Sequence, residues 1–191
     1  PLMDRFDIEG PSALKGSIEA GGSKNCALPV LFATLLSPHK HNLTGVPRLM
    51  DMDSTLKMLV HMGCTVDQKH ARNFGSDWIV DATELTSHEA PYDLVRKMRA
   101  SNLCLGPLLT RLGKARVSLP GGCAIGARPM DLHLMALEKL GAIITQSAGY
   151  IEAALPKGQK RLTGTRIIFP LVSVGATENT VMAATLATGT T

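Results

Sequence analysis

Two kinds of helical pattern alternate with short strand patterns along the chain. Apolar helices are predicted at 23–36, 92–109 and 176–187. Shorter amphipathic helices are predicted at 51–62 and 129–140; each has an acidic first turn and a glycine, Gly63 or Gly141, at the position after the helix where glycine is favoured. Strands are predicted at 41–43, 65–67, 78–80, 115–119, 143–145 and 150–152. The pattern therefore predicts a repeated α-β-α-β-β unit.

The same residues recur at a nearly constant separation. Thr110, Gly121, Asp131 and Gly141 follow Thr34, Gly45, Asp53 and Gly63 by 76, 76, 78 and 78 residues. A fixed period of this kind is the signature of a repeat architecture. Units are expected at 23–90 and 91–170, with a partial third at 171–191. We expect an α/β (α+β) fold in which the helices share one core inside a ring of sheets.

The third unit is incomplete, because only 17 residues run from Gly175 to Thr191. Its last helix would lack the sheet that covers it, which leaves apolar surface exposed. We therefore expect the chain to be a piece of a longer protein, and self-association through the incomplete unit is a further expectation. A genuine stop with a frayed terminal helix is the alternative.

Composition removes several classes of protein. The longest apolar run, Cys26–Leu36, has 11 residues and contains Pro29, so it is too short to span a bilayer. The N-terminal residues show no secretion signal, and the four cysteines form no C-x-x-C pair, so a reduced, cytoplasmic protein is predicted. No metal constellation and no cofactor motif is visible, and we predict neither.

The net charge of +4 suits an anionic partner. The basic residues are scattered and only 4% of residues are aromatic, so no nucleic-acid surface is predicted. A small phosphorylated ligand or simply a well-solvated surface explains the charge equally well.

Two segments carry candidate chemistry. The glycine-rich loop 120–131 contains Cys123, five residues before Arg128 and next to a predicted helix start; both features lower a thiol pKa and make Cys123 a candidate acid or nucleophile. Gly21–Asn25 opens the first helix with Lys24, which suits a phosphate or carboxylate, although Ser23 as a plain N-cap explains the pattern equally well.

Structural roles are the default for other polar residues. Arg96 and Arg99, three apart on one predicted helix, read as a solvated face. His133 near Asp131 invites a general-base reading, but a capping Asp and a surface His are favoured. Core packing is predicted for the other three cysteines, Cys26, Cys64 and Cys104.

Five motifs of the chain closely resemble one family. They are GSKN at 22–25, APYDLV at 90–95, MRAS at 98–101, LPGGCAIGARP at 119–129 and VSVGAT at 172–177. On these residues the chain is similar to the UDP-N-acetylglucosamine 1-carboxyvinyltransferase family of enolpyruvyl transferases. The similarity runs from Met3 to Thr191 and covers less than half of a typical member, which has two domains of three repeats.

The resemblance implies an inside-out α/β barrel, with residues 1–22 forming strands of the other domain. It also implies transfer of the enolpyruvyl group of phosphoenolpyruvate to the 3′-hydroxyl of UDP-N-acetylglucosamine, in peptidoglycan synthesis. Cys123 would donate a proton, bond phosphoenolpyruvate covalently and be alkylated by fosfomycin. Phosphoenolpyruvate would be held by Lys24, Asn25 and Arg128. The nucleotide sugar would be contacted by Arg99, Arg128, Pro129, Met130, Asp131, Leu132, Val172, Ser173 and Val174.

The chain departs from the family pattern at three points. Met50 and Leu171 stand where lysine is common, although Arg48 lies near Met50. The catalytic Asp and several arginines of the family belong to its second half, so we expect this chain alone to be inactive or nearly so. The shikimate-pathway enolpyruvyl transferase lacks the cysteine loop; a non-catalytic binding module and a folding remnant without function are the alternatives of another class.

Overall fold

The structure is a computed structural model that describes residues 5–72, 75–96, 98–119 and 130–191 and, of Arg72 and Arg99, the backbone alone. The first unit contains α1 (Lys24–Ala33), the 3-10 helix η1 (Thr34–Leu36), β1 (Lys40–Val46), α2 (Met50–His61), β2 (Thr65–Arg72) and β3 (Gly75–Asp81). The first unit ends with β4 (Glu89–Ala90), which pairs with β5 of the second. The second unit contains α3 (Tyr92–Val95), the 3-10 helix η2 (Arg99–Cys104), α4 (Leu105–Leu112), β5 (Lys114–Ser118), α5 (Asp131–Lys139), β6 (Ile143–Ser147) and β7 (Tyr150–Ala154). The third begins with α6 (Val174–Thr185). This order confirms the α-β-α-β-β pattern of the sequence.

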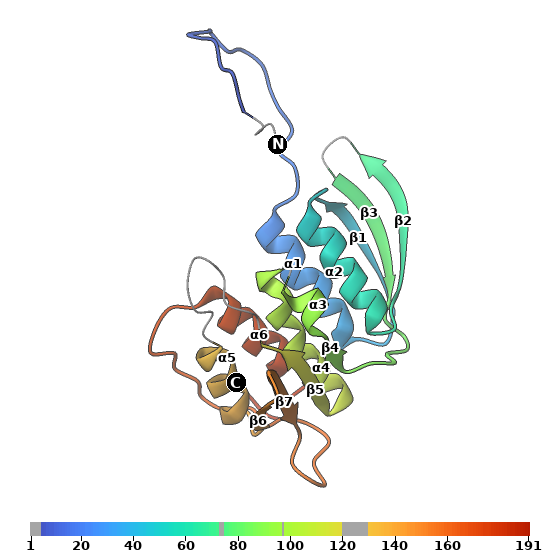
Figure 1. Ribbon diagram of the computed structural model, residues 1–191, viewed down its shortest axis with the longest axis vertical. Helices are drawn as coiled ribbons and strands as arrows, with labels where there is room; N and C mark the ends of the chain where they lie inside the picture. The colour runs from blue at the N-terminus through green and yellow to red at the C-terminus, as the bar shows by residue number, and fades with distance from the viewer. Residues whose placement is uncertain (1–4, 73–74, 97, 120–129) are drawn as a thin grey trace.

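The helices lie between two sheets, as Figure 1 shows. One sheet has the strand order β1-β3-β2 and is antiparallel; the other has the order β4-β5-β7-β6, with only the short β4–β5 pair parallel. The helices therefore form the middle of the molecule and the sheets lie outside them, which is the inside-out arrangement that the repeat predicts.

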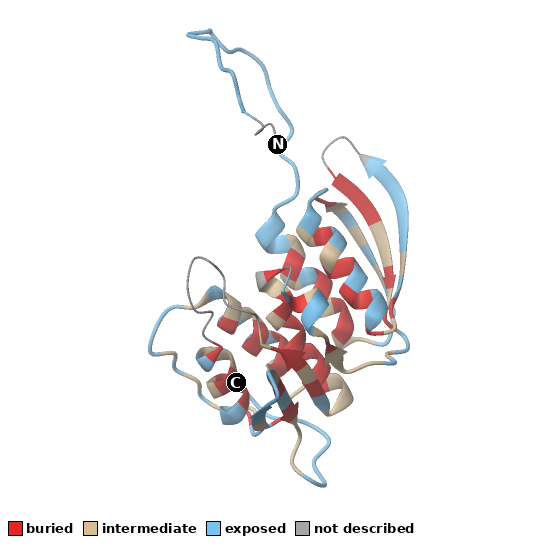
Figure 2. Cartoon of the chain, viewed as in Figure 1, coloured by how far each residue is buried: buried red, intermediate tan, exposed pale blue. Residues whose placement is uncertain are grey.

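The centre of this arrangement is α4. Its residues Leu105 to Thr110 are all buried, so the helix is covered on every side rather than along one stripe (Figure 2). It contacts η1 of the first unit, β5 of its own unit and α6 of the third. Six successive buried residues are typical of a helix inside the core of a domain.

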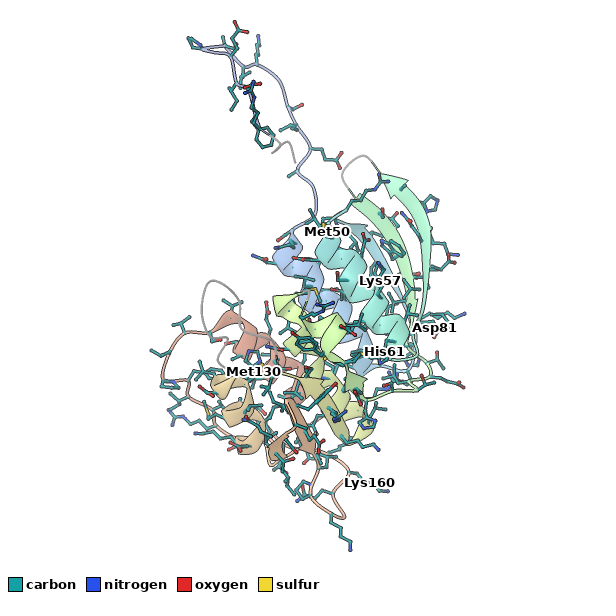
Figure 3. All side chains as sticks on the ribbon, viewed as in Figure 1. Met50, Lys57, His61, Asp81, Met130 and Lys160 are labelled. Carbon is teal, nitrogen blue, oxygen red and sulfur yellow. The ribbon has the colours of Figure 1, made fainter. Side chains whose placement is uncertain are left out.

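The amphipathic helix α2 shows how the pattern of the sequence positions an element. Its buried residues, Met52, Thr55, Leu56, Met58 and Leu59, face the core. Lys57 and His61 lie on its exposed side (Figure 3). The chain leaves α2 and α5 through Gly63 (φ 105°) and Gly141 (φ 95°), in the left-handed region that glycine adopts without strain, as predicted.

The predicted helix 92–109 is not continuous, and this is a correction. It is divided into α3, η2 and α4, because Met98 has an extended backbone (φ −149°, ψ 129°). The Ser101 hydroxyl donates to the carbonyl oxygens of Met98 (2.6 Å) and Val95 (3.3 Å), so carbonyls at the break keep a partner. Arg96 and Arg99 consequently belong to different elements and do not share a helical face.

The last helix also differs from its predicted start. α6 begins at Val174 rather than at Ala176, because Ser173 is the N-cap and its hydroxyl accepts a hydrogen bond from the Ala176 N–H (3.3 Å). Residues 5–22 contain no helix or strand and extend away from the body (Figure 1). None of the helices in the described ranges has the length and apolar character needed to cross a bilayer.

Candidate active site

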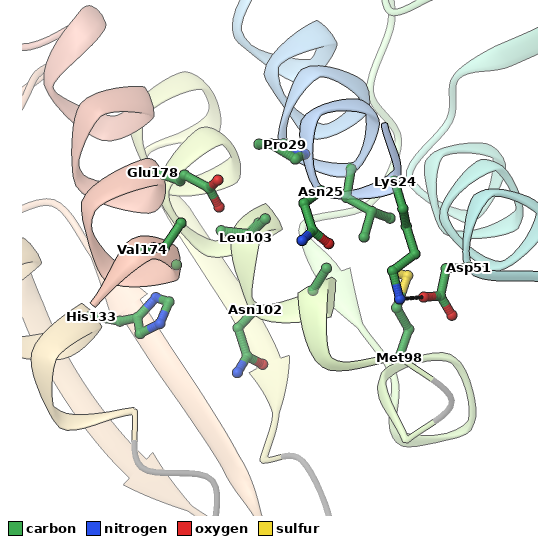
Figure 4. Close-up of a pocket in the computed structure, with 13 residues that line it drawn as sticks. Lys24, Asn25, Pro29, Asp51, Met98, Asn102, Leu103, His133, Val174 and Glu178 are labelled. Carbon is green, nitrogen blue, oxygen red and sulfur yellow. Dashed lines mark ion pairs between the residues drawn. The ribbon is translucent and has the colours of Figure 1, made fainter. Parts of the chain in front are cut away.

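One cavity of about 420 Å³ is lined by the beginnings of several helices (Figure 4). Residues from the first turns of α1, α2, α5 and α6 reach it, together with η2. The first turn of a helix has N–H groups without intrahelical partners and a partial positive charge, and both attract anions. Its lining is Lys24, Asn25, Leu28, Pro29, Asp51, Met98, Ala100, Asn102, Leu103, His133, Val174, Gly175 and Glu178.

Lys24 supplies a cation at this cavity. It is the first residue of α1, and the Ser23 hydroxyl caps that helix by accepting from the Cys26 N–H (3.4 Å). The Lys24 ammonium lies 3.0 Å from a carboxylate oxygen of Asp51 on α2, and both side chains remain partly exposed. Asn25 follows on the same turn and points into the cavity (Figure 4). Sequence reasoning proposed Lys24 and Asn25 as ligands, and both residues line this cavity.

Asp51, Asn102 and Glu178 line the same cavity and were missed by sequence reasoning. The Asn102 Oδ1 atom is buried and has no hydrogen-bond partner within the part of the chain that the structure describes. Burial raises the pKa of Glu178 above the usual value for glutamate. Only the period of the repeat hinted at Asn102, because it brings the segment around Ala100 into register with that around Lys24.

His133 was assigned to the surface by sequence reasoning, and this was wrong. The imidazole is half-buried and lines the cavity, where burial lowers its pKa. Its Nδ1 lies 3.3 Å from Nδ2 of Asn179, which is fully buried on α6. The two residues are 46 positions apart, so no local pattern indicates the contact. Asp131 is exposed in the first turn of α5, where its charge suits the helix dipole, and the N-cap residue is Met130 rather than Asp131.

The other predicted ligand residues have different surroundings. Cys123, Arg128 and Pro129 lie outside the described residues, and of Arg99 only the backbone is described. The Met130 side chain is buried in the core, whereas Leu132 is half-buried. Val172 is fully exposed, Val174 lines the cavity and the Ser173 hydroxyl caps α6.

The described cysteines follow the prediction in two cases of three. Cys64 and Cys104 are buried, and burial raises the pKa of Cys64 to about 11 and that of Cys104 to about 12. Cys26 is exposed, which corrects the prediction of core packing: α1 turns its Leu28, Leu31 and Phe32 to the core instead. No group of His, Cys, Asp or Glu side chains in the described ranges is arranged to hold a metal ion.

Comparisons with known proteins agree with this fold. The family model described as EPSP synthase (3-phosphoshikimate 1-carboxyvinyltransferase) matches residues 8–191. Among solved structures, the enolpyruvyl transferase NikO from Streptomyces tendae superposes with a TM-score of 0.71 at 20% identity, over 92% of this chain and 40% of that one. An EPSP synthase from Acinetobacter baumannii superposes with a TM-score of 0.67 at 20% identity, over 93% of this chain and 40% of that one. These neighbours confirm the inside-out α/β fold.

Curated relatives are much more similar in sequence. The UDP-N-acetylglucosamine 1-carboxyvinyltransferase of Enterobacter cloacae is 50% identical over 189 residues, which is 99% of this chain and 43% of that protein. The enzyme of the same name from Sphingopyxis alaskensis is 53% identical over 190 residues, which is 98% of this chain and 44% of that protein. The chain thus spans less than half the length of these relatives. It belongs to the EPSP synthase family of enolpyruvyl transferases, and its sequence matches the N-terminal part of the UDP-N-acetylglucosamine 1-carboxyvinyltransferases.

Proposed function

We propose that the chain forms part of an enzyme that transfers the enolpyruvyl group from phosphoenolpyruvate to UDP-N-acetylglucosamine, the first committed step of peptidoglycan synthesis. The observation that carries the proposal is the cavity at which Lys24 meets the first turns of four α-helices. Such a site favours an anion carrying phosphate and carboxylate groups. The names of the relatives at about half identity supply the acceptor, UDP-N-acetylglucosamine, and the transferred carboxyvinyl group.

The proposed chemistry is an addition followed by an elimination. The 3′-hydroxyl oxygen of the sugar bonds to C2 of phosphoenolpyruvate while C3 receives a proton. The hydroxyl proton then leaves to a base, C3 loses a proton, and the C2–O bond to phosphate breaks. The products are the enolpyruvyl ether and inorganic phosphate, so no oxidant or cofactor is required.

Phosphoenolpyruvate is assigned to the α1 side of the cavity. Lys24 and Asn25 would hold its anionic groups there, and Arg128 would add charge to the phosphate. The Lys24 ammonium leaves or shares its contact with Asp51 when the ligand arrives, and the partial exposure of both side chains allows this. Cys123 would supply the proton to C3 and is the proposed site of alkylation by fosfomycin.

The nucleotide sugar is assigned to the α5 and α6 side. Arg99, the segment Arg128–Leu132 and the segment Val172–Val174 would contact it, with Met130 restricted to backbone contacts because its side chain is buried. Met50 and Leu171 are 84% and 72% exposed, so the lysines common in the family fit these positions without burial of charge. Met50→Lys and Leu171→Lys should each strengthen binding of the nucleotide sugar.

The domain assignment supports the same proposal. We assign residues 1–22 to strands of a second domain, because Phe6, Ile8, Leu14 and Ile18 are at least 88% exposed in the arm and alternate in the manner of a strand with one covered face. Residues 23–191 form the transferase domain, with units at 23–90, 91–170 and 171–191. Self-association through the third unit, where Leu171 and Val181 are exposed, stays a prediction, as does a cytoplasmic location.

Calorimetry with phosphoenolpyruvate tests the anion site directly. Lys24→Met should weaken binding about ten- to a hundred-fold, because the lost charge-assisted contact is worth about 1.5–3 kcal/mol. Lys57→Met is the matched control, since Lys57 lies on the exposed side of α2. Absence of binding by the native chain, or equal loss in both variants, would contradict the assignment.

Release of phosphate separates the enzyme from a binding module. We expect the 191-residue chain to bind its ligands without measurable turnover, because the family places its catalytic Asp beyond the matched part. Phosphate release that depends on UDP-N-acetylglucosamine would overturn that expectation and assign a base to this chain. Release with shikimate 3-phosphate instead would favour the shikimate-pathway reaction, which the family model's description also allows.

A further inference from the structure

The buried Asn179 joins two elements that the proposed mechanism does not connect. It lies on α6, has no exposed surface, and is placed between Gly106 of α4 and His133 of α5. The Gly106 N–H donates to its Oδ1 at 2.8 Å, and its Nδ2 lies 3.3 Å from His133 Nδ1. An amide side chain that is buried and bonded at both ends has one orientation.

This orientation fixes the proton on the imidazole. A backbone N–H only donates, so the atom of Asn179 that faces Gly106 is the oxygen, and the amino group must face His133. An amide amino group also only donates, so His133 Nδ1 must be the unprotonated acceptor. In the neutral ring the proton is then on Nε2.

The packing of α4 on α6 protects the amide from turning. A Cβ atom at Gly106 would lie 2.6 Å from both the backbone oxygen and Oδ1 of Asn179, so only glycine allows the two helices to approach this closely. One turn further along, the Thr110 hydroxyl donates to the Ala183 carbonyl oxygen at 3.2 Å. The orientation of Asn179 is therefore a property of the core.

The free edge of the ring is at the cavity wall. A Cβ atom at Gly175 would lie 3.6 Å from both Cε1 and Nε2 of His133, and Gly175 lines the cavity together with His133. Within the described ranges Nε2 makes no hydrogen bond. Burial lowers the pKa of His133, which keeps the ring neutral at pH 7. The charged groups around it are Lys24, Asp51 and Glu178 at the cavity and Asp131 on its own helix.

We propose that Asn179 is a positioning residue that holds His133 in the Nε2-protonated form, so that the imidazole donates a hydrogen bond to a substrate oxygen in the cavity. The identity of the substrate in this proposal rests on the proposed function, whereas the tautomer of His133 does not. The arrangement supplies a neutral donor beside the cationic Lys24. The corresponding position in the first unit is Thr55, whose hydroxyl donates to the Asp51 carbonyl oxygen of its own helix and lies 3.1 Å from the Met98 sulfur.

Nitrogen-15 NMR of labelled histidine in the full chain, without substrates, tests the positioning. The His133 signals, assigned in the native chain by correlating the ring with its own backbone, should show an unprotonated Nδ1 and a protonated Nε2. A proton on Nδ1 in the native chain would overturn the proposal, and this reading needs no variant to fold.

Asn179→Asp inverts the prediction. A carboxylate still accepts from Gly106 but can only accept from His133, so the proton should move to Nδ1 and the pKa of His133 should rise. Asn102→Asp is the matched control, because it adds the same charge at the cavity that His133 lines, with no contact to Nδ1, and should leave the proton on Nε2. If His133 keeps its native tautomer in Asn179→Asp, the assignment is contradicted.

Titration with phosphoenolpyruvate and UDP-N-acetylglucosamine tests the donor role separately. The Nε2 signal should shift on binding of one ligand in the native chain, and much less in Asn179→Asp. Binding detected by calorimetry with no change at Nε2 would overturn the donor role. Absence of any binding, with the predicted tautomer present, would count against the proposed function and leave the positioning intact.

Discussion

In the first unit the apolar helix α1 begins at the cavity with Lys24 and continues unbroken to Ala33. Seventy-six residues later, Ala100 occupies the corresponding place in η2, after the break at Met98. In the third unit the place belongs to Gly175. All three residues line the same cavity. The repeat therefore brings equivalent helix starts to one point, and the units differ there in the chemistry they offer.

Away from the cavity the units differ in how they are joined. Leu35 of the first unit is fully buried, and Arg111 occupies the corresponding position in the second. The Arg111 guanidinium donates to the carbonyl oxygens of Leu35 (3.0 Å), Ala82 (2.7 Å) and Thr83 (3.1 Å). A position that fills the core in one unit thus binds the two units together in the other.

The largest expected effect is at the apolar member of this pair. Leu35→Ala should lower the free energy of unfolding by about 2–5 kcal/mol, because it leaves a cavity in a close-packed core. Urea denaturation measures the change. Val60→Ala on the exposed side of α2 is the control and should stay within about 0.5 kcal/mol. If Leu35→Ala lowered the free energy of unfolding no more than Val60→Ala does, Leu35 would not lie in the core.

Substitution of Arg111, the polar member of the pair, should lower the free energy of unfolding by less. Arg111→Met keeps the aliphatic stem but leaves three carbonyl oxygens without their donor, so we expect a loss of about 2 kcal/mol. Arg161→Met, at an exposed position, serves for comparison. If Arg111→Met were as stable as the native chain, the link between the units would contribute nothing.

A pH series should reveal His133 through a smaller change. Burial lowers its pKa in the folded chain below the ordinary value of 6.5, so the unfolded chain binds more protons there. The stability contribution of the neutral ring is present above pH 6.5 and is lost as the pH falls below it. His133→Gln should reduce this dependence, whereas His70→Gln at an exposed site should preserve it.

Glu178 changes the stability with pH in the opposite direction to His133. Its folded pKa is raised, so its contribution is present below the unfolded value of 4.5 and is lost as the pH rises above it. Thermal unfolding between pH 4 and pH 8 separates the two groups. Equal slopes for the native chain and His133→Gln near pH 6 would contradict the buried position of the imidazole.

The smallest effect is expected at the surface of α3. Arg96 pairs with Asp93 at 3.3 Å, with both side chains more than half exposed, and lies over the Tyr92 ring. Arg96→Ala should change stability by about 0.3 kcal/mol, and salt should diminish even that. A loss comparable to that of Arg111→Met would show a structural role that the exposed geometry does not explain.

The sequence predicted the elements and the repeat because both depend on local apolar spacing and on glycines such as Gly63 and Gly141. It placed Lys24 and Asn25 at the site because a helix start can be recognised locally. The break at Met98 was missed, since the apolar spacing of the segment continues across it and does not reveal the bonds from the Ser101 hydroxyl to the carbonyls of Val95 and Met98. His133 was misplaced because its partner, Asn179, is provided by the third unit.

The complete burial of α4 has a consequence for cooperativity. This helix is packed against η1, β5 and α6, so each unit loses part of its own core if another opens. Repeat proteins whose units contact only their neighbours in a line can unfold piece by piece. Here the units surround a common element, and we expect a single unfolding transition in which the amides of α4 exchange with solvent last.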